Sequence, residues 1–331
     1  MPSLVVVGGS DPSPEARAAF GKLAGEVELF EESEAMLSNL EPDWVVVAAP
    51  AAQHADLCVQ ALGQGAHVFC EKPFVESLRD ADRVIAAAES AGRVVVVNHE
   101  FPSMPIHAKL VDAARSATYG RPLFLQAWQN VQLGEEDQAG WRSEWKTMQE
   151  FGTHVIDLSM CIFGGAPSAV TARMPSPTSD KGDLIDLVSL EFENGGSASI
   201  VLNRICSGRH RYLDLRLDTE NASLRSSVGG RMSVSLSVAP STHRPGVELD
   251  LAKGGMAWIE HEAGREVLAT NPGDVFAHAT GVHLRSTLEA VARGEEPSVS
   301  AVWARQVVRV VEAAYESAAK GCTVSLERAD G

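Results

Sequence analysis

Residues 44–73 read WVVVAAPAAQHADLCVQALGQGAHVFCEKP, and this stretch decides the fold. Its two short runs at 44–48 and 67–70 are apolar on both faces, as the strands of a helix-covered parallel sheet must be. Between them, residues 51–62 have a helical pattern that ends at Gly63. A strand, a helix and a second strand in this order predict a βαβ unit with parallel strands.

The same alternation continues on both sides of this unit. Apolar, β-branched runs at residues 4–7 and 93–97 predict further strands, and helical patterns at 14–23 and 77–91 lie between the runs. The sequence therefore predicts an α/β domain with a Rossmann-like, doubly wound parallel sheet, which we place in residues 1–120.

After about residue 120 the pattern changes to alternating, Thr/Ser/Val-rich segments separated by turn residues. The expected strands are residues 122–132, 168–174, 183–193, 197–205, 212–218, 223–228, 232–238 and 256–261. The expected helices are residues 150–163, 282–292 and 301–319. We therefore predict an α+β domain over residues 121–331 with a mostly antiparallel open sheet, whose C-terminal helices 282–320 pack back on the first domain.

Composition excludes several classes of partner. Twenty-eight basic and 44 acidic side chains give a formal charge of −16, which repels the phosphates of nucleic acids and anionic membrane surfaces. The five cysteines are scattered without a CxxC pair, so they predict neither a disulfide framework nor a zinc site. The sequence shows no signal peptide and no run of about 18 apolar residues. We therefore expect a cytoplasmic protein without nucleic-acid or membrane partners.

The lysine of the Glu-Lys-Pro tripeptide, Lys72, is the first candidate for catalysis. It follows the buried run 67–70 at the carboxyl edge of the sheet, where open α/β sheets bind their ligands. A lysine there can donate to a substrate hydroxyl. Burial beside a positive charge would lower its pKa and let it share a proton with that hydroxyl. The alternative is a surface lysine at the end of a strand.

Two motif blocks resemble the Gfo/Idh/MocA family of sugar oxidoreductases. The first runs from the Ala-Pro turn at Pro50 through His54 to Gly-Ala-His-Val-Phe-Cys-Glu-Lys-Pro at residues 65–73. The second is Glu-Phe-Gly-Thr-His-Val-Ile-Asp at residues 150–157, which is similar to the family's Asp-x-Gly-x-His-x-x-Asp helix start. The closing segment 276–326 also resembles the family's last helices, so the resemblance covers most of the chain.

The resemblance implies an acid–base pair and a substrate cleft. Lys72 and His154 would face each other across it, with the histidine assisting proton removal from the substrate hydroxyl. Glu150, four residues before His154, would orient or charge-stabilise its ring. The alternative for His154 is a core histidine in a capped helix. The further residues implied are Pro50, His54, Glu71, Lys72 and Pro73 for the cofactor, and Asn98, Trp141, Arg142 and Asp157 for the substrate.

The family's nucleotide-binding fingerprint, Gly-x-Gly-x-x-Gly after the first strand, is absent from this sequence. Gly8 and Gly9 could supply part of that turn, and Ser10 could replace a backbone contact with its hydroxyl. Pro12 and Pro14, however, remove two N–H groups where phosphate donors are wanted.

A second alignment explains more of this segment. If the run 4–7 is the family's second strand, Asp11 becomes the acid that binds the adenosine ribose. A strand at 27–30 and a short helix then precede Trp44, and the family's first βα unit is missing. A further departure lies after the run 93–97, where the family's Arg-Phe appears as Glu100-Phe101 and exchanges a cation for an anion in the cleft.

Three functions remain open. The first is an NAD(P)-dependent oxidoreductase that acts on a sugar, an inositol or a related polyol, with NAD or NADP as the hydride carrier. The second is a cofactor-independent lyase, isomerase or cyclase that uses the same Lys72 and His154 cleft, which the missing fingerprint favours. The third is a non-catalytic partner subunit. One face of the second domain's sheet has no helix left to cover it, so we expect a homodimer or homotetramer.

Overall fold

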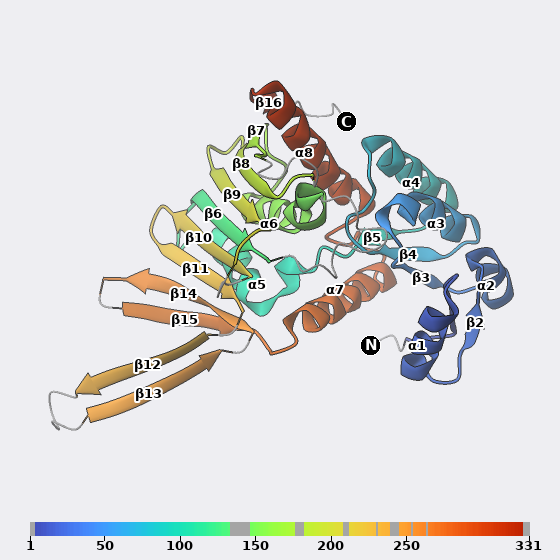
Figure 1. The fold of residues 1–331 in the computed structure, drawn as a ribbon, viewed down its shortest axis with the longest axis horizontal. Helices are drawn as coiled ribbons and strands as arrows, with labels where there is room; N and C mark the ends of the chain where they lie inside the picture. The colour runs from blue at the N-terminus through green and yellow to red at the C-terminus, as the bar shows by residue number, and fades with distance from the viewer. Residues whose placement is uncertain are drawn as a thin grey trace. The chain divides into compact units, whose positions relative to one another are not determined.

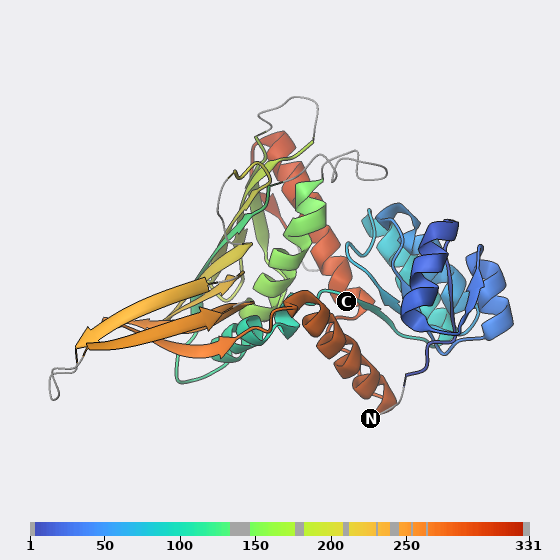
Figure 2. The same cartoon turned by 60° about the horizontal axis from the view of Figure 1, so that its bottom comes forward.

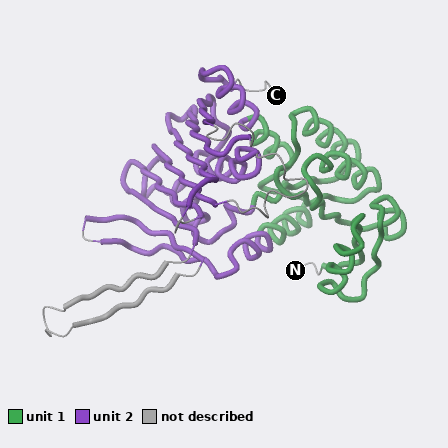
Figure 3. Tube along the Cα trace, viewed as in Figure 1, with its two compact units in different colours: residues 1–99, 283–309 green, residues 100–282, 310–331 purple. Residues whose placement is uncertain are grey.

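The computed structural model describes residues 4–132, 146–175, 182–207, 212–229, 231–238, 245–252, 254–262 and 264–326. The chain forms two compact units, of which unit 1 comprises residues 1–99 and 283–309 and unit 2 comprises residues 100–282 and 310–331 (Figure 3). The first division lies at residue 99, earlier than the boundary expected at 120. Helices α7 (Val275–Ala292) and α8 (Ala301–Lys320) each belong partly to both units.

Unit 1 alternates short strands with helices along the chain (Figure 1). Its elements before residue 99 are β1 (Gly8–Ser10), α1 (Pro14–Ala24), β2 (Glu28–Phe30), α2 (Ser33–Leu40), β3 (Trp44–Val47), α3 (Ala51–Gly63), β4 (His67–Cys70), α4 (Leu78–Ala91) and β5 (Val95–Val97). Local signals set the ends of these helices. At α4, the Ser77 side chain accepts from the Asp80 N–H, and Gly92 ends the helix with a φ of 60°. The predicted Rossmann-like alternation is confirmed.

The parallel strands of unit 1 lie in two separate sheets. β1 pairs with β2, whereas β3, β4 and β5 form a second sheet in that order. Doubly wound folds commonly order their strands 3-2-1-4-5-6. Without strand 1, this order leaves strands 3 and 2 as a pair and strands 4, 5 and 6 as a triplet. The pair β1–β2 and the triplet β3–β4–β5 show the same pattern. The pairing therefore agrees with the second alignment of the sequence, in which β1 corresponds to the second strand of the fold.

The run 4–7 does not form the predicted strand, which begins at Gly8 instead. Its side chains are 46% to 76% exposed, and Val46 of β3 is 61% exposed. Parallel strands are normally buried on both faces. In the described part of the chain no strand pairs with residues 4–7 or with the second edge of β3. Without such a neighbour the backbone of the run has no ladder to join, and its apolar side chains stay in water.

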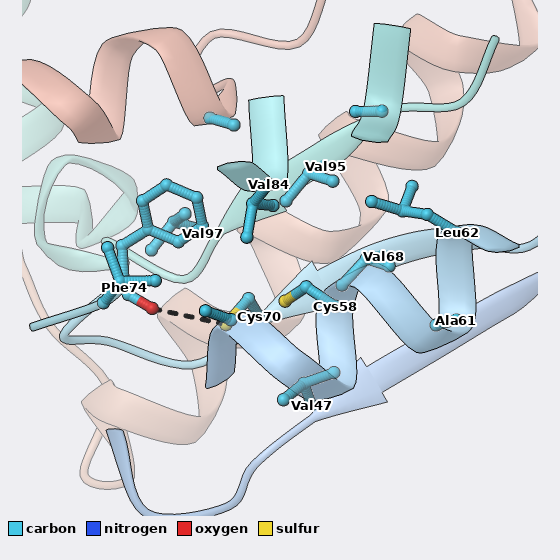
Figure 4. Close-up of a cluster of buried hydrophobic side chains, with 14 of the residues drawn as sticks. Val47, Cys58, Ala61, Leu62, Val68, Cys70, Phe74, Val84, Val95 and Val97 are labelled. Carbon is cyan, nitrogen blue, oxygen red and sulfur yellow. Dashed lines mark hydrogen bonds between the residues drawn. The ribbon is translucent and has the colours of Figure 1, made fainter. Parts of the chain in front are cut away.

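The core of unit 1 gathers around β4 and β5 (Figure 4). Val68, Cys70 and Val97 are fully buried, and they cluster with Cys58 and Leu62 of α3. Burial of an aliphatic side chain of this size stabilises a fold by about 1.5–3 kcal/mol. This packing fixes the carboxyl ends of β4 and β5, after which Lys72 and Asn98 follow.

Unit 2 is built on a nine-stranded sheet with the order β15-β14-β11-β10-β6-β9-β8-β7-β16. Its strands are β6 (Pro122–Asn130), β7 (Ala169–Arg173), β8 (Ile185–Glu191), β9 (Ser197–Asn203), β10 (Leu213–Thr219), β11 (Ser223–Val228), β14 (Gly255–His261), β15 (Gly264–Thr270) and β16 (Val324–Ser325). A separate hairpin pairs β12 (Arg231–Val238) with β13 (Pro245–Ala252). Among these pairs only β6 with β9 is parallel, so the predicted mostly antiparallel sheet is confirmed.

Helical segments of unit 2 cover one face of this sheet (Figure 2). They are η1 (Phe101–Ser103), α5 (Pro105–Ala114), the π-helical turn η4 (Met148–Gly152) and α6 (Thr153–Phe163). Buried and half-buried residues alternate along β9 and β10, as expected when one face is packed and the other is open. On the open face Trp128 is 38% exposed and Leu187 is 43% exposed.

Most expected elements of unit 2 are present, although their ends are shifted. The sequence analysis did not predict the helices η1 and α5 or the strands β13, β15 and β16. The helix expected at 150–163 is observed as α6 preceded by the π-helical turn. Within the described ranges, no helix combines the length and the apolar character needed to cross a membrane.

Candidate active site

Two loops at the carboxyl edge of the β3–β5 sheet are tied together by hydrogen bonds. Asn98, just after β5, donates from Nδ2 to Oε1 of Glu71 at 2.7 Å, and its backbone N–H donates to the Cys70 carbonyl at 2.7 Å. Oε2 of Glu71 also accepts from the backbone N–H of Lys72 at 3.3 Å. Glu71 therefore bonds both to its own loop and to the β5 loop. The turn that carries Lys72 is held in place by these contacts.

In unit 1 the buried His99 lies within electrostatic reach of Lys72, and a second buried histidine, His283, lies within reach of His99. His99 is 1% exposed, and its pKa is lowered to about 3, first by burial and then by the charges of His283 and Lys72. Burial also lowers the pKa of His283 to about 4. Both imidazoles are therefore neutral near pH 7, and neither adds a positive charge beside Lys72.

His54 of α3 bridges the loops that follow β3 and β4. Its Nε2 lies 2.7 Å from the Ala49 carbonyl oxygen. Its Nδ1 lies 2.9 Å from the Pro73 carbonyl oxygen and 3.1 Å from that of Phe74. The ring is 1% exposed, and both nitrogens face backbone acceptors. His54 thus links the two loops. Because its ring is buried, a cofactor would contact the loops and not the ring itself.

The two glycines expected in the phosphate-binding turn have a packing role in this structure. A Cβ added to Gly8 would lie 2.4 Å from Cδ1 of Leu40, and one added to Gly9 would lie 2.6 Å from the ring of Phe20. A Cβ at Gly8 would also lie 2.8 Å from the Glu28 carbonyl oxygen, so the close packing of β1 favours glycine. This close approach uses the space that a ligand would need at these positions.

The donors of the turn after β1 are bonded within the turn itself. The Ser13 N–H donates to the Asp11 carboxylate at 2.8 Å, and the Ser13 hydroxyl accepts from the Ala16 N–H at 3.2 Å. Pro12 and Pro14 have no N–H to offer. The amino end of α1 is therefore capped by its own residues rather than open to an anion.

The charge at this helix start is also unfavourable for a phosphate. Glu15 lies in the first turn of α1, and a backbone hydrogen bond followed by the Ser13 hydroxyl lowers the pKa of its carboxyl group. A carboxylate here occupies the favourable end of the helix dipole that a pyrophosphate would otherwise use. The turn formed by Gly8, Gly9, Ser10 and Asp11 consequently does not fit the pyrophosphate of a dinucleotide.

In unit 2, His154 lies in the first turn of α6. The start of this helical segment is fixed by the carboxylate of Asp183, which lies just before β8. Asp183 accepts from the N–H groups of Thr147 and Met148, each at 2.9 Å, and from the hydroxyl of Tyr315 at 3.0 Å. A carboxylate at the amino end of a helix bonds the free amides and favours the helix dipole. Asp183 therefore anchors the segment that presents His154.

His154 is 3% exposed and contacts an acid and an aromatic ring. Its Nδ1 lies 3.7 Å from Oε2 of Glu100, which is an electrostatic contact longer than a normal hydrogen bond. Its ring stacks on Phe101, with centroids 4.1 Å apart and planes inclined by 10°. Glu100 and Phe101 are consecutive, so one short segment sets both the plane of the imidazole and the group at one of its edges.

Further buried polar side chains surround the start of α6. Asp157 is fully buried three residues after His154. Asp186 is also fully buried, and its pKa is raised to about 8, chiefly by burial and then by the neighbouring Asp183. The guanidinium of Arg204 lies 3.4 Å from the ring centre of Phe151, in cation–π geometry. Near pH 7 Asp186 is therefore mostly protonated, and the positive charge of Arg204 acts to lower its pKa.

The structure places the predicted residues in three groups, of which the first is the turn at Gly8 to Asp11 described above. Residues at the edge of the β3–β5 sheet in unit 1 are Pro50, His54, Glu71, Lys72, Pro73 and Asn98. Residues of the helical segment in unit 2 are Glu150, His154 and Asp157. The convergence of Lys72 with His154, and of Glu150 with the imidazole, stay predictions. Trp141 and Arg142 lie outside the described residues.

The sequence analysis missed the roles of two acids. Glu100 drew attention as a departure from the family pattern, but its contact with His154 joins residues 54 positions apart and no local spacing reports it. Asp183 was expected only as part of a strand. In the described ranges no group of three His, Cys, Asp or Glu side chains is arranged to hold a metal ion.

Two family models match the chain. The model described as "Oxidoreductase family, NAD-binding Rossmann fold" matches residues 2–99, and the "GFO/IDH/MocA C-terminal domain" matches residues 107–225. The chain belongs to the Gfo/Idh/MocA family. It is therefore a member of an oxidoreductase family whose first domain is an NAD-binding Rossmann domain, and the dehydrogenase or reductase class expected from the sequence is confirmed.

Curated Gfo/Idh/MocA relatives have names that concern sugars and polyols. The chain is 27% identical over 329 residues to D-apiose dehydrogenase from Paraburkholderia graminis, covering 96% of this chain and 82% of that protein. It is 29% identical over 197 residues to inositol 2-dehydrogenase 4 from Saccharopolyspora erythraea, covering 58% of this chain and 56% of that protein. These relatives agree with a small sugar-like substrate.

Solved structures of other oxidoreductases share the fold. An oxidoreductase from Agrobacterium radiobacter in complex with NAD+, L-tartaric acid and magnesium has a TM-score of 0.80 and 18% identity, covering 96% of this chain and 90% of that one. Aldose-aldose oxidoreductase from Caulobacter crescentus, complexed with glycerol, has a TM-score of 0.78 and 20% identity, covering 97% and 91%. At these identities the likeness establishes the fold.

Proposed function

We propose that the chain is an NAD(P)-dependent dehydrogenase or reductase that acts on a sugar, an inositol or a related polyol. The observation that carries the proposal is the Lys72 turn, which follows a buried parallel strand and is fixed by the hydrogen bond between Asn98 and Glu71. Open α/β sheets bind their ligands at this edge. The names of the apiose and inositol dehydrogenases similar to this chain support a polyol as the substrate.

In this proposal Lys72 and His154 share the proton of the reacting hydroxyl. The lysine ammonium donates up to three hydrogen bonds, and an imidazole can gain or release a proton near neutral pH. A positioned general acid or base typically contributes about 10²–10⁴-fold to the rate. Glu150 supports the charge of the imidazole, and Asp157 anchors the ring or the substrate. Asn98, Trp141 and Arg142 complete the proposed substrate contacts.

The nicotinamide cofactor, when bound, accepts or supplies the hydride. Pro50, Glu71 and Pro73 are proposed to hold its nicotinamide end, because they follow β3 and β4 at the ligand-binding edge. Asp11 is proposed for the adenosine ribose. The proton chemistry is assigned to Lys72 and His154, since a nicotinamide carries a hydride and not the hydroxyl proton.

We also propose that the protein forms a homodimer or homotetramer through the open face of the unit 2 sheet. This face carries half-exposed apolar side chains such as Trp128 and Leu187. A groove of about 760 Å³ on unit 2 is lined in part by Trp128, Arg225, Trp258 and Glu260. Apolar sheet faces of this kind are usually covered by a partner. A mass measurement in solution at micromolar concentration tests the assembly, and a strict monomer would contradict it.

A substrate panel tests the proposed activity. The protein is incubated with aldoses, inositols and acyclic polyols, each with NAD+ or NADP+, and reduced nicotinamide is followed by its absorbance. We expect turnover of at least one sugar or cyclic polyol, and turnover slower by about a hundredfold or more in a Lys72→Met variant of the same stability. Absence of turnover throughout the panel, together with no binding of any of the four nicotinamide dinucleotides at millimolar concentration, would overturn the proposal.

A further inference from the structure

We propose that Glu100 is the positioning residue of His154, holding the Nδ1 edge of the imidazole so that Nε2 is the nitrogen presented to the substrate hydroxyl. The catalytic role of Glu100 rests on the proposed function, because Glu100 acts on the histidine of the same acid–base pair. The observations that carry it are the 3.7 Å separation of Nδ1 from Oε2 and the burial of both residues within unit 2.

The segment that carries Glu100 is anchored on its C-terminal side. The Glu100 carbonyl accepts from the Ser103 N–H at 2.9 Å, and the Phe101 carbonyl accepts from the Met104 N–H at 3.1 Å. Nδ1 of the buried His107 lies 3.0 Å from the Phe101 carbonyl oxygen as well. Because these bonds fix the backbone, the stacked ring of Phe101 and the carboxylate of Glu100 approach the imidazole from a rigid support.

The Glu100 carboxylate lies among other titratable side chains. Glu100 is 8% exposed, and an acid so buried needs a cation or hydrogen-bond donors nearby. Among the described residues, His154 lies beside this carboxylate and Tyr212 responds to its charge. Burial, and after it the charge of Glu100, raises the pKa of the Tyr212 hydroxyl, whereas Arg204 acts in the opposite direction. An imidazolium at His154 would balance the Glu100 charge directly.

Glu150, the acid expected from the sequence, lies in different local geometry. It belongs to the π-helical turn Met148–Gly152, in which hydrogen bonds run from residue i to i+5. Residues four apart share a face in an α-helix, but the wider turn displaces them from that relationship. Glu100 reaches His154 from a separate segment and needs no helical spacing to do so.

The assignment defines where the proton goes. With the Nδ1–H directed at Glu100, the lone pair of Nε2 accepts the proton of the substrate hydroxyl. The O–H bond breaks, the Nε2–H bond forms, and the ring becomes an imidazolium whose charge the Glu100 carboxylate stabilises without taking a proton. In the reverse direction the same Nε2–H returns the proton to the oxygen. Loss of this carboxylate would weaken the stabilisation of the imidazolium.

The chain offers a matched control for this pair. In unit 2, Nε2 of His261 also lies 3.7 Å from a glutamate oxygen, Oε2 of Glu266, but these side chains are 53% and 67% exposed. Exposed pairs interact weakly because water screens them. Glu266→Gln should therefore change the titration of His261 little, whereas the same replacement at the buried pair should change the titration of His154 strongly.

The test is nitrogen NMR of the histidine side chains across a pH series, with Glu100→Gln, Glu100→Asp, Glu150→Gln and Glu266→Gln. We expect Glu100→Gln to lower the titration midpoint of His154 by about one pH unit or more, since an opposite charge favours the protonated ring. Glu100→Asp should restore part of the shift, and Glu150→Gln should shift it less. An unchanged midpoint in Glu100→Gln, or a larger shift in Glu150→Gln, would overturn the proposal.

Kinetics add a second readout. On a substrate found in the panel, Glu100→Gln should lower kcat by about 10- to 100-fold with KM changed less than about threefold, and should move the acidic limb of the pH profile downward. An unchanged pH profile would contradict the assignment. Because the NMR measurement needs no substrate, it tests the role of Glu100 even if the panel shows no activity, which would instead count against the proposed function.

Discussion

Nδ2 of Asn98 lies 2.7 Å from Oε1 of Glu71, and this hydrogen bond joins the end of β5 to the end of β4. Asn98 is 2% exposed, so water cannot replace the bond when it is broken. The next residue after Glu71 is Lys72, whose backbone N–H bonds to the same carboxylate. The position of the proposed catalytic lysine thus depends on a bond between two neighbouring loops.

Replacement of Asn98 by alanine should therefore lower both stability and activity. We expect a loss of about 1–3 kcal/mol of unfolding free energy, as for a buried acceptor left without its donor, measured by chemical denaturation. Activity, as kcat/KM, should fall by about tenfold because the Lys72 turn loosens. Asn39→Ala serves as the control, since Asn39 makes its 2.7 Å bond to the Ala35 carbonyl on an exposed helix. Wild-type kcat/KM in Asn98→Ala would contradict this role.

His54→Asn should uncouple the loops after β3 and β4. The shorter side chain cannot span from the Ala49 carbonyl to those of Pro73 and Phe74, so buried carbonyls lose their donor. Hydrogen exchange at the backbone amides of the Glu71 to Phe74 loop should become at least about tenfold faster. The exposed His278 of α7 gives the control variant, His278→Asn, for which exchange in this loop should match the wild type. Unchanged exchange in His54→Asn would show that the bridge is not needed.

The order of elements in unit 1 could be predicted because β3, β4 and β5 are short apolar runs and because α1 and α4 each begin at a capping serine. The strand expected at 4–7 was placed too early, since apolar character alone does not provide the neighbouring strand that a ladder requires. β15 was missed because Gly264–Thr270 is a largely exposed edge strand without a clear alternation. α5 was missed because it begins at Pro105 directly after η1, without a capping side chain.

The candidate site could be predicted only in part. Lys72 and His154 are recognisable from contiguous motifs, and the carboxyl edge of a parallel sheet is a general ligand site. The contacts that hold them join residues far apart in sequence, such as Glu100 with His154 and Asp183 with Met148. Such contacts arise from tertiary packing, which one sequence does not report. The packing role of Gly8 and Gly9 likewise depends on Leu40 and Phe20.

The buried acid Asp186 should make stability depend on pH in a defined direction. Its folded-state pKa is raised to about 8 from an ordinary value of 3.8, so the folded state keeps a proton that the unfolded state has released across this window. The stabilising contribution of this group is therefore present below pH 3.8 and is lost as pH rises towards 8. Asparagine does not titrate, so Asp186→Asn lacks this pH dependence. The melting temperature of the variant minus that of the wild type should therefore be larger at pH 8 than at pH 5.

The same comparison with Asp112→Asn provides the control, because Asp112 is 69% exposed and pairs only at the surface with Lys109. Its effect on the melting temperature should be small and the same at both pH values. If the Asp186→Asn difference were equal at pH 5 and pH 8, or larger at pH 5, the assignment of a raised pKa to this carboxyl group would fail.

Calorimetry of NAD(H) and NADP(H) tests the misfit of the turn after β1. We expect micromolar to low-millimolar dissociation constants, because a pyrophosphate gains no amide donors from this turn. Glu15→Gln removes the carboxylate at the start of α1 and should leave the dissociation constant within about twofold, since no phosphate lies beside it. A tenfold tightening in Glu15→Gln would show that the pyrophosphate does bind at this helix start.

The proposed acid–base pair is tested most directly by the turnover of Lys72→Ala, His154→Ala and the double variant on a substrate from the panel. Each single variant should lower kcat by about a hundredfold or more while circular dichroism and melting temperature stay close to the wild type. Because both side chains are proposed to act on one hydroxyl, the double variant should be no more than about tenfold slower than the slower single variant. Wild-type turnover in either single variant, or in the double variant, would contradict the proposed acid–base pair.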